Sequence, residues 1–444
     1  MAPDTGPADV VIVGGGFSGT MLAAELARRG VRATLIERSG REGRGTAYST
    51  PEDAHLLNVV AAKMGAWADE PGHFAKTVEG EGYQPDDFVP RRRYGEYLSE
   101  ILQEAESSGL VTVVRADAQS AEPRSSGGWK VALGDGSTLE AQSLVVAHGN
   151  QSPEPPEAAE GISDRLFVND PWSDEGRKVV ERAAKANSEV LLIGTGLTMI
   201  DVVLSLDEAG HRGQICALSR RGLAPRAHAE HSPAPVRIEE VPQGSLKQLW
   251  EWLRSQSARV GWRAAIDSIR PYTHQIWQAL TDADRLRFLR HARPWWDVHR
   301  HRIAPEVAGR IKQLVQEGRL HIVAGRVKAM REENGAISVA IQRRGMENAK
   351  SVKFGLAVNC TGPLGAISES DDPLLNSLFE GNHARPDSLD LGLEVDGKSR
   401  IAGAKRAWAL GPLTKGRFWE ITAVPDIRGQ VASVADDIAE ELKR

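Results

Sequence analysis

The sequence predicts an α/β fold built from two Rossmann-like dinucleotide-binding domains. Two glycine-rich turns, at residues 14–19 and 194–199, each follow an apolar strand and precede a helical run. The 444 residues are enough for two domains with large cores. A helical pattern at about residues 244–318 predicts a helical insertion beside these domains.

The first turn carries a complete G-x-G-x-x-G pattern. It follows the β-branched strand 9–13 and places Gly14, Gly16 and Gly19 at the required spacing. Gly14 allows the tight turn, Gly16 lets a pyrophosphate approach the backbone, and Gly19 lets the helix pack close to the strand. The helix that follows would present its N-terminal amides to the phosphates.

An acidic residue completes the first nucleotide-binding unit. The next strand, 31–36, ends at Glu37, which is followed by Arg38. An acid about 20 residues beyond the turn typically binds the ribose hydroxyls. We therefore expect Glu37 and Arg38, together with Phe17 and Ser18 of the turn, to contact a nucleotide.

The second turn departs from the pattern. Gly194 and Gly196 are in place, but Met199 stands where the third glycine is expected. A bulky residue there means that the helix stands away from the strand or that the methionine fills a gap. The two glycines, with Leu197 and Thr198, are the predicted contacts of a second nucleotide.

Two arginines replace the acid in the second unit. The strand 214–218 is followed by Arg220 and Arg221. An acid would favour NAD, whereas arginine accommodates the 2′-phosphate of NADP. We expect NADPH rather than NADH. The alternative is a domain that has lost its ligand, in which both arginines are solvated.

Composition limits the class of protein. The net charge of −5 argues against nucleic acid as a partner, and 41% hydrophobic with 26% charged residues is typical of a soluble globular chain. Residues 1–7 lack the features of a signal peptide, and no apolar run has the length of a membrane span. These observations predict a cytoplasmic protein.

The cysteines limit the redox chemistry. Cys216 and Cys360 are far apart in the sequence and each lies in a predicted strand, so buried free thiols are expected. No Cys-x-x-Cys pair and no metal-binding spacing of cysteine and histidine is present. Electrons that reach a redox cofactor bound by this chain would leave for dioxygen or for another external acceptor.

The order of the motifs resembles that of flavoproteins with two dinucleotide-binding domains. More narrowly, it is similar to a bacterial group of FAD/NAD(P)-binding proteins, and distantly to N-hydroxylating and Baeyer–Villiger-type monooxygenases. The stretches that carry the resemblance are GRGTAY at 43–48 with HLLNV at 55–59, FVPR at 88–91 with the helix start at 94–98, GTGLTM at 194–199, RPWWDVHRHR at 293–302, and 411–425.

This resemblance implies that the second domain is inserted in the first. The expected bounds are 1–185 for the first part of the FAD-binding domain and 186–354 for the NAD(P)H-binding domain, which includes the helical insertion 244–318. Residues 355–444 would return to the FAD-binding domain.

The resemblance also implies contacts with FAD. Gly14, Gly16, Gly19 and Glu37 would hold the diphosphate and ribose. The further implied contacts are Arg44 and Thr46 along the pyrophosphate, Asn58 near the flavin, Gly149 and Gly362 in two strand-end turns, and Gly411 before a turn whose amides face the flavin pyrimidine. One departure is that 167–172 lacks the Phe-x-Gly-x₃-His linker of Baeyer–Villiger-type enzymes.

Candidate catalytic residues carry weaker signals. His148, in the first strand-end turn, is either a proton shuttle over the flavin or a structural histidine. The basic, aromatic segment 285–302, with Trp295 and Arg302, is either a lid or anion pocket, or a helical insertion whose arginines pair with acids. Arg417, near the predicted flavin turn, is a candidate for the pocket wall.

The favoured function is therefore that of an FAD-dependent NAD(P)H oxidoreductase, a monooxygenase that uses dioxygen on a small organic substrate. One alternative is an NAD(P)H:acceptor reductase without oxygenation. Another is a non-catalytic flavin-binding subunit, which Met199 favours. Neither a metal nor a membrane is expected as a partner.

Overall fold

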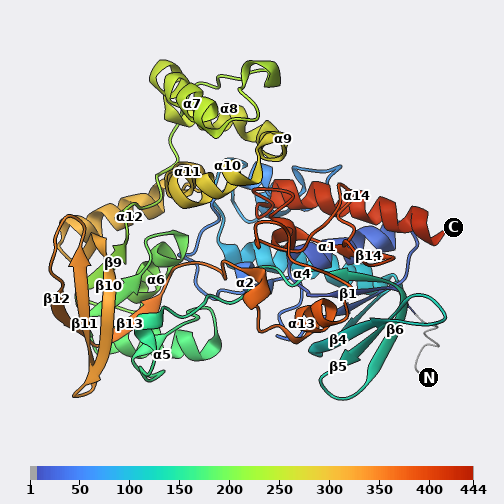
Figure 1. The fold of residues 1–444 in the computed structure, drawn as a ribbon, viewed down its shortest axis with the longest axis horizontal. Coiled ribbons are helices and arrows are strands. Elements are labelled where there is room, and N and C mark those ends of the chain that lie inside the picture. The colour runs from blue at the N-terminus through green and yellow to red at the C-terminus, as the bar shows by residue number, and fades with distance from the viewer. Residues whose placement is uncertain (1–7, 444) are drawn as a thin grey trace.

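The computed structural model describes residues 8–443 and contains two mixed sheets. Figure 1 shows the two sheets in separate parts of the molecule, with a helical segment that projects from one side. The prediction about a signal peptide at residues 1–7 lies outside the described residues.

The first sheet is formed by both ends of the chain. Its order is β3 (Val111–Val114), β2 (Ala33–Ile36), β1 (Ala8–Val13), β6 (Thr138–Val146), β5 (Trp129–Leu133) and β4 (Ala118–Pro123), and β14 (Ala407–Ala409) also pairs with β6. Strands β1, β2, β3, β6 and β14 pair in parallel, whereas β4, β5 and β6 form an antiparallel meander. Because β14 is parallel to β6, the chain returns to this sheet after the second one is complete.

Apolar residues of β1 point alternately to two cores. Val10 and Ile12 belong to a cluster with helices α1 (Phe17–Arg28), α4 (Arg91–Ser107) and α14 (Val424–Leu442). Val11 and Val13 belong to the cluster on the opposite face, with α13 (Pro373–Glu380). A central parallel strand that is buried on both faces explains its continuous β-branched sequence. Short helices α2 (Gly45–Tyr48) and α3 (His73–Glu79) and the turn η1 (Ala61–Lys63) lie between β2 and α4.

The second sheet repeats this plan. Its order is β12 (Lys350–Phe354), β11 (Ala336–Arg343), β10 (Leu320–Glu333), β9 (Ile215–Ser219), β8 (Val190–Ile193), β13 (Leu356–Asn359) and β7 (Phe167–Val168). Strands β7 to β10 and β13 are parallel, and β11 and β12 are antiparallel. Helices α5 (Asp174–Lys185), α6 (Leu197–Glu208) and α12 (Pro305–Gln316) contribute to its apolar cluster.

The bounds of the second unit differ from the expected 186–354. Strands β7 and β13 lie in the second sheet, so this sheet begins before residue 186 and ends after residue 354. The reason is that β13 pairs with β8 and takes the central place that β6 takes beside β1 in the first sheet.

The predicted helical stretch divides into two parts. Its elements are α7 (Leu246–Val260), α8 (Trp262–Ile269), α9 (Thr273–Ala279), α10 (Asp282–Arg287), a π-helical turn (Phe288–Ala292), α11 (Arg293–Arg300) and α12. Helices α7, α8, α9 and α11, with the π-helical turn, build a separate apolar cluster that includes Leu389 and Trp419 of the returning chain. Helix α12 instead packs on the second sheet through Val307, Ile311 and Leu314. Over residues 8–443, no helix combines the length and apolarity needed to cross a membrane.

Candidate functional site

The first glycine turn is held by close backbone contacts. Gly14 has φ +108°, and a Cβ on it would lie 2.5 Å from the carbonyl oxygen of Ala147. A Cβ on Gly19 would lie 1.9 Å from the carbonyl oxygen of Gly14. Both positions therefore require glycine because β1, β6 and α1 approach each other there.

Gly16 occupies a more open position. It is the N-cap of α1 with φ −75°, and no side chain accepts a hydrogen bond from the first turn of the helix. The nearest atom to a Cβ on Gly16 would be Cα of Gly45, at 3.7 Å. The open space and the unbonded amides form an N-terminal cradle of the kind that binds phosphate.

Glu37 is buried at the end of β2. Its carboxylate accepts hydrogen bonds from the amide of Gly15 at 2.7 Å and from the amide and hydroxyl of Ser39 at 2.7 and 2.6 Å. These contacts fix the acid beside the glycine turn. Arg38, in contrast, is exposed, and its guanidinium lies 3.8 Å from Asp117.

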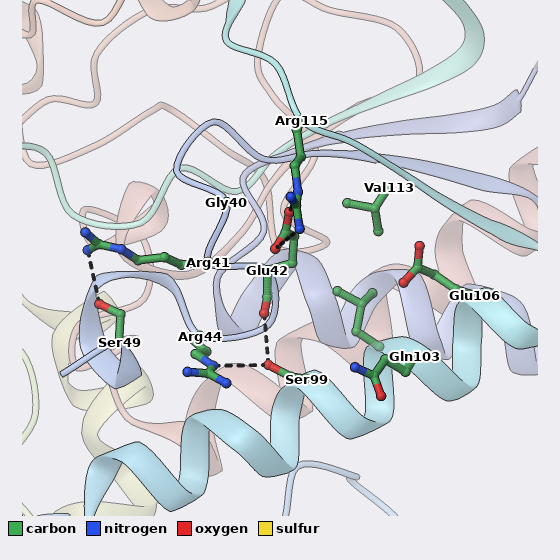
Figure 2. A pocket seen from close by; sticks show the side chains of 11 residues that line it. Gly40, Arg41, Glu42, Arg44, Ser49, Ser99, Gln103, Glu106, Val113 and Arg115 are labelled. Carbon is green, nitrogen blue, oxygen red and sulfur yellow. Dashed lines mark hydrogen bonds and ion pairs between the residues drawn. The ribbon is translucent and has the colours of Figure 1, made fainter. Parts of the chain in front are cut away.

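A polar cavity of about 670 Å³ adjoins the loop at residues 40–44, as Figure 2 shows. The amide of Gly43 donates to the carbonyl of Gly15 at 3.0 Å, so the cavity wall is attached to the glycine turn. Arg44 lines the cavity, with Nε 3.4 Å from the hydroxyl of Ser99. Arg115 pairs with Glu42 across it. Thr46, in α2, is exposed beside this loop.

The returning chain closes on the first turn. Gly411 has φ +63°, and its amide donates to Oε1 of Gln430 at 2.8 Å. A Cβ on Gly411 would lie 2.7 Å from the hydroxyl oxygen of Ser18. Phe17 and Ser18 are both buried at this junction. The structure thus brings Gly411 next to the N-terminus of α1, although the two are far apart in the sequence.

His148 lies in the turn after β6, before Gly149, whose φ is +74°. Its Nδ1 is 3.1 Å from Oδ2 of Asp372, the N-cap residue of α13. Burial acts to raise the pKa of Asp372, but the hydrogen bond and charge of His148 hold that pKa below its ordinary value. His148 is thus the partner of Asp372 in this turn, and its role as a proton shuttle stays a prediction.

The second glycine turn has the same geometry as the first. Gly194 has φ +118°, and its Cβ would lie 2.1 Å from the carbonyl oxygen of Cys360 at the end of β13. Gly196 is the N-cap of α6, again without a side-chain cap, and a Cβ there would have no atom within 4 Å. Leu197 and Thr198 begin α6 at this open space. Gly362 lies two residues after Cys360, so this turn belongs to the second unit, whereas the resemblance implied a contact with FAD in the first.

Met199 fills a gap in the core. Its side chain is fully buried in the cluster of the second sheet. Of the two readings of this departure, the structure supports a methionine that packs under the helix, and the glycine turn keeps its form.

The arginine turn is linked to the second glycine turn. The hydroxyl of Thr195 donates to the hydroxyl of Ser219 at 2.8 Å, and Ser219 also accepts from the amide of Gly222 at 3.0 Å. Between these residues, Arg220 is exposed and Arg221 donates to the carbonyl of His291 at 3.0 Å. Both arginines therefore lie at the same sheet edge as Gly196.

Buried polar contacts join the two units. The guanidinium of Arg91, at the start of α4, lies 2.8 Å from Oδ2 of Asp201 in α6 and donates to the carbonyl of Leu56 at 3.1 Å. The ring of His55 contacts the hydroxyl of Thr50 at 2.7 Å and the carbonyl of Asp201 at 3.0 Å. These contacts fix α6 against residues 50–56 of the first unit.

The arginines of segment 285–302 are mostly paired with acids. The pairs are Arg285 with Asp282, Arg287 with Asp284, Arg293 with Asp297, Arg300 with Glu420, and Arg302 with Asp267. Of the two readings of this segment, the geometry supports the packed helical insertion. Trp295, at 40% exposure, and Arg417 lie at the surface.

Glu420 anchors the insertion on the returning chain. Its carboxylate accepts from the indole of Trp296 at 2.7 Å and lies 3.1 Å from Nε of Arg300 and 3.5 Å from Nε2 of His301. Burial would raise its pKa, but His301 and Arg300 lower that pKa to about 2. Beside it, the rings of Trp277 and Trp419 stack with centroids 4.7 Å apart.

Asn58 has a neighbour that the sequence did not suggest. Its carbonyl lies 3.0 Å from Nε2 of His228, whose ring packs on Phe88 with centroids 5.0 Å apart. Burial, together with nearby positive charge, lowers the pKa of His228 to about 4, so the ring is neutral at pH 7. The only sequence signal was that the basic run after β9 continues beyond Arg221 to Arg226 and His228.

The two cysteines are free thiols of the second unit: Cys216 lies in β9, and Cys360 directly follows the end of β13. Burial raises the pKa of both thiols, which makes them poor nucleophiles at pH 7. Over residues 8–443, no group of three or more histidine, cysteine or acidic side chains is arranged to hold a metal ion.

Comparison with known proteins connects this geometry to a family. Residues 11–151 match a family described as FAD-NAD(P)-binding. The Baeyer-Villiger monooxygenase ATR8 of Stachybotrys chlorohalonatus is 29% identical over 210 residues, which cover 45% of this chain and 32% of that protein. The chain thus spans about a third of the length of this curated relative.

Solved structures share the whole fold. The reduced ornithine hydroxylase of Pseudomonas aeruginosa covers 98% of this chain and 100% of its own, with a TM-score of 0.70 at 14% identity. The ornithine N-hydroxylase of Kutzneria sp. 744, solved with reduced FAD, NADP⁺ and L-ornithine, covers 99% and 100%, with a TM-score of 0.67 at 16% identity. These likenesses confirm the predicted fold class, because the two sheets share the arrangement of two Rossmann-like domains.

Proposed function

We propose that this chain, whose residues 11–151 match the FAD-NAD(P)-binding family, is an FAD-dependent NAD(P)H oxidoreductase that oxygenates a small organic substrate. The observation that carries the proposal is the pair of glycine turns of the same build. Each has a glycine with positive φ against a neighbouring strand, and each has an open glycine N-cap at the start of a helix.

FAD fits the first site. The open space before Gly16 and the amides of α1 suit the diphosphate, and Glu37, fixed beside them, suits the ribose hydroxyls. Arg44, which lines the adjoining cavity, supplies positive charge close to the same turn. Gly411 brings the returning chain to the N-terminus of α1, where its turn would contact the flavin.

NADPH fits the second site. Gly196 leaves the N-terminus of α6 open, and Arg220 and Arg221 lie at the same edge, where a 2′-phosphate would meet them. The packing of Met199 in the core removes the main argument for a site that has lost its ligand.

The contacts between the units hold the two sites in one arrangement. Bound FAD would accept a hydride from NAD(P)H and pass electrons to dioxygen. The chain's part is to bind both nucleotides, and Arg91 with Asp201 keeps α6, and thus the second nucleotide, fixed against the first unit. Dioxygen is favoured as the acceptor because the two cysteines are separate, inert thiols and because the related proteins named above are a hydroxylase, an N-hydroxylase and a monooxygenase.

The test is a screen of amines, thioethers, ketones and organic acids with the FAD-loaded protein and NADPH in air. The proposal predicts that one class stimulates NADPH oxidation and yields an oxygenated product, with less hydrogen peroxide released than oxygen consumed. Turnover with quinones or dyes in the absence of oxygen, together with no oxygenated product in air, would support a reductase instead.

A further inference from the structure

A cluster of positive charge lies where the two units meet the helical insertion. Its guanidinium groups belong to Arg226, after β9, to Arg263, in α8, and to Arg302, after α11. The positive charges of Arg302 and Arg226 both act on Arg263, and those of Arg302 and Lys63 act on His228. We call these three arginines the cationic cluster.

Arg302 is the most buried member of the cluster, with only 5% exposure. Its terminal nitrogen pairs with Asp267, but its Nε has no hydrogen-bond partner within residues 8–443. A buried N–H of a charged group that lacks a protein partner is costly, and a water molecule or a bound anion can satisfy it.

Arg263 shows the same pattern. One terminal nitrogen donates to the carbonyl of Ala227 at 2.9 Å, while its Nε is unbonded in the described part of the chain. Its guanidinium stacks over the ring of Trp262, 4.2 Å from the centroid, and that of Arg302 lies 5.7 Å from the same centroid. Trp262 therefore holds both guanidinium groups on one ring.

The positive charge is poorly balanced. Asp267 is the acid that pairs with Arg302, and it is shared with His231, whose Nε2 lies 3.1 Å from its carboxylate. Burial lowers the pKa of Arg263, and the nearby positive charges of Arg302 and Arg226 lower it further. An added anion would relieve this repulsion.

The backbone connects the cluster to Asn58. Residues 226–228 pair with 298–303: the amide of His228 donates to the carbonyl of Ile303 at 2.9 Å. The same His228 contacts the carbonyl of Asn58 through its ring. The cluster is thus built on a segment that touches the residue expected near the flavin.

We propose that the cationic cluster binds the carboxylate of an anionic organic substrate and holds it on the Asn58 side of the junction between the units. Arginine suits this role because its planar guanidinium binds a carboxylate through paired hydrogen bonds. This inference rests on the proposed function in one respect: it treats the bound anion as the substrate of that reaction. Arg220 and Arg221, at the end of β9, are the separate candidates for the phosphate of NADPH.

Binding of benzoate to the FAD-loaded protein tests the proposal by calorimetry. Benzyl alcohol serves as the neutral analogue and 2′,5′-ADP as the probe for nucleotide phosphate. We expect benzoate to bind at least about tenfold more tightly than benzyl alcohol, as a charge-assisted hydrogen bond predicts. Arg263→Gln should lower the affinity for benzoate by about tenfold or more and change the affinity for 2′,5′-ADP by no more than about twofold.

The controls separate binding from folding. Arg254→Gln, on the exposed side of α7, should leave benzoate affinity unchanged. If Arg263→Gln does not fold, Arg226→Gln at an exposed position of the same cluster gives the same test. Equal affinity for benzoate and benzyl alcohol, unchanged benzoate affinity in the folded variant, or weakening of 2′,5′-ADP alone would each overturn the proposal. This binding needs no turnover, so the two proposals can fail separately. If the protein binds benzoate but NADPH does not reduce its bound flavin, the proposed function is refuted and the anion site stands.

Discussion

Single glycines shape the two proposed nucleotide sites, and they have two different tasks. Gly14 and Gly194 are required by the fold, since positive φ and a neighbouring carbonyl exclude any Cβ. Gly16 and Gly196 have ordinary φ values and open space in front of them, so a Cβ there would disturb a ligand rather than the protein. This difference allows binding to be tested apart from folding.

Gly16→Ala should keep the fold and lose FAD. The new methyl group meets only Cα of Gly45 at 3.7 Å, an ordinary contact, but it occupies the approach of the pyrophosphate. We expect an unchanged melting temperature for the apoprotein and a loss of at least about tenfold in FAD affinity, measured from the ratio of flavin to protein absorbance during titration. Gly196→Ala is the matched control, since it should retain FAD and raise KM for NADPH. A Gly16→Ala protein with full FAD content would contradict the assignment.

Arg221→Gln, alone or with Arg220→Gln, should reduce the preference for NADPH. Loss of a charged partner for the 2′-phosphate is expected to lower kcat/KM for NADPH by about tenfold or more and to leave that for NADH nearly unchanged. The measurement is flavin reduction with each nucleotide. Equal kcat/KM values for NADPH and NADH in the unaltered protein would show that these arginines do not select the cofactor.

At the scale of elements, the helical insertion depends on the returning chain for part of its core. The rings of Trp277, Trp296 and Trp419 are buried in one apolar cluster. Glu420 accepts a hydrogen bond from the indole of Trp296 and forms an ion pair with Arg300. Glu420 also has φ +73°, an uncommon conformation for a non-glycine residue. The insertion is therefore fastened to the segment that carries Gly411.

Glu420→Gln should destabilise the protein by about 3–5 kcal/mol, because it leaves Arg300 buried without its counter-charge. The pKa of Glu420 is lowered to about 2 in the folded protein, from an ordinary value of 4.5. Its stabilising effect is thus present above about pH 4.5 and is lost as the pH falls toward 2. As the pH is lowered from about 4.5 toward 2, the free energy of unfolding measured with urea should fall less for the variant than for the unaltered protein. Parallel acid profiles would contradict the role given to this carboxylate.

The elements near the glycine turns could be predicted from sequence because their signals are local. Strand 9–13, the three glycines and Glu37 follow one another within a single β–α–β unit, and the structure keeps them together. The division of the helical stretch could not be predicted in this way. Helix α12 and the helices of the insertion have similar amphipathic patterns, and only the crossover from β9 to β10 places α12 on the second sheet.

The candidate sites show the same limit. In segment 285–302, the partners of Arg300 and Arg302 are the distant acids Glu420 and Asp267, whereas Arg285, Arg287 and Arg293 pair with acids three or four residues away. The cationic cluster combines Arg226, Arg263 and Arg302 from three separate segments, so no spacing in the sequence could indicate it. Such sites form only when long-range topology brings the segments together.

At the scale of the molecule, the chain consists of two similar α/β units held in one arrangement. The contacts of Arg91 with Asp201 and of His55 with the carbonyl of Asp201 are buried and link residues of different units. This arrangement is what electron transfer between two bound nucleotides would need, because the second helix cannot shift freely against the first unit.

The most direct test of this account is rapid mixing of the FAD-loaded protein with NADPH in the absence of oxygen. We predict that the absorbance of the oxidised flavin is lost within one turnover, and that readmitted oxygen restores it. A protein that cannot be loaded with FAD, or a bound flavin whose spectrum neither NADPH nor NADH changes, would contradict the central claim that electrons pass between two nucleotides held by this chain.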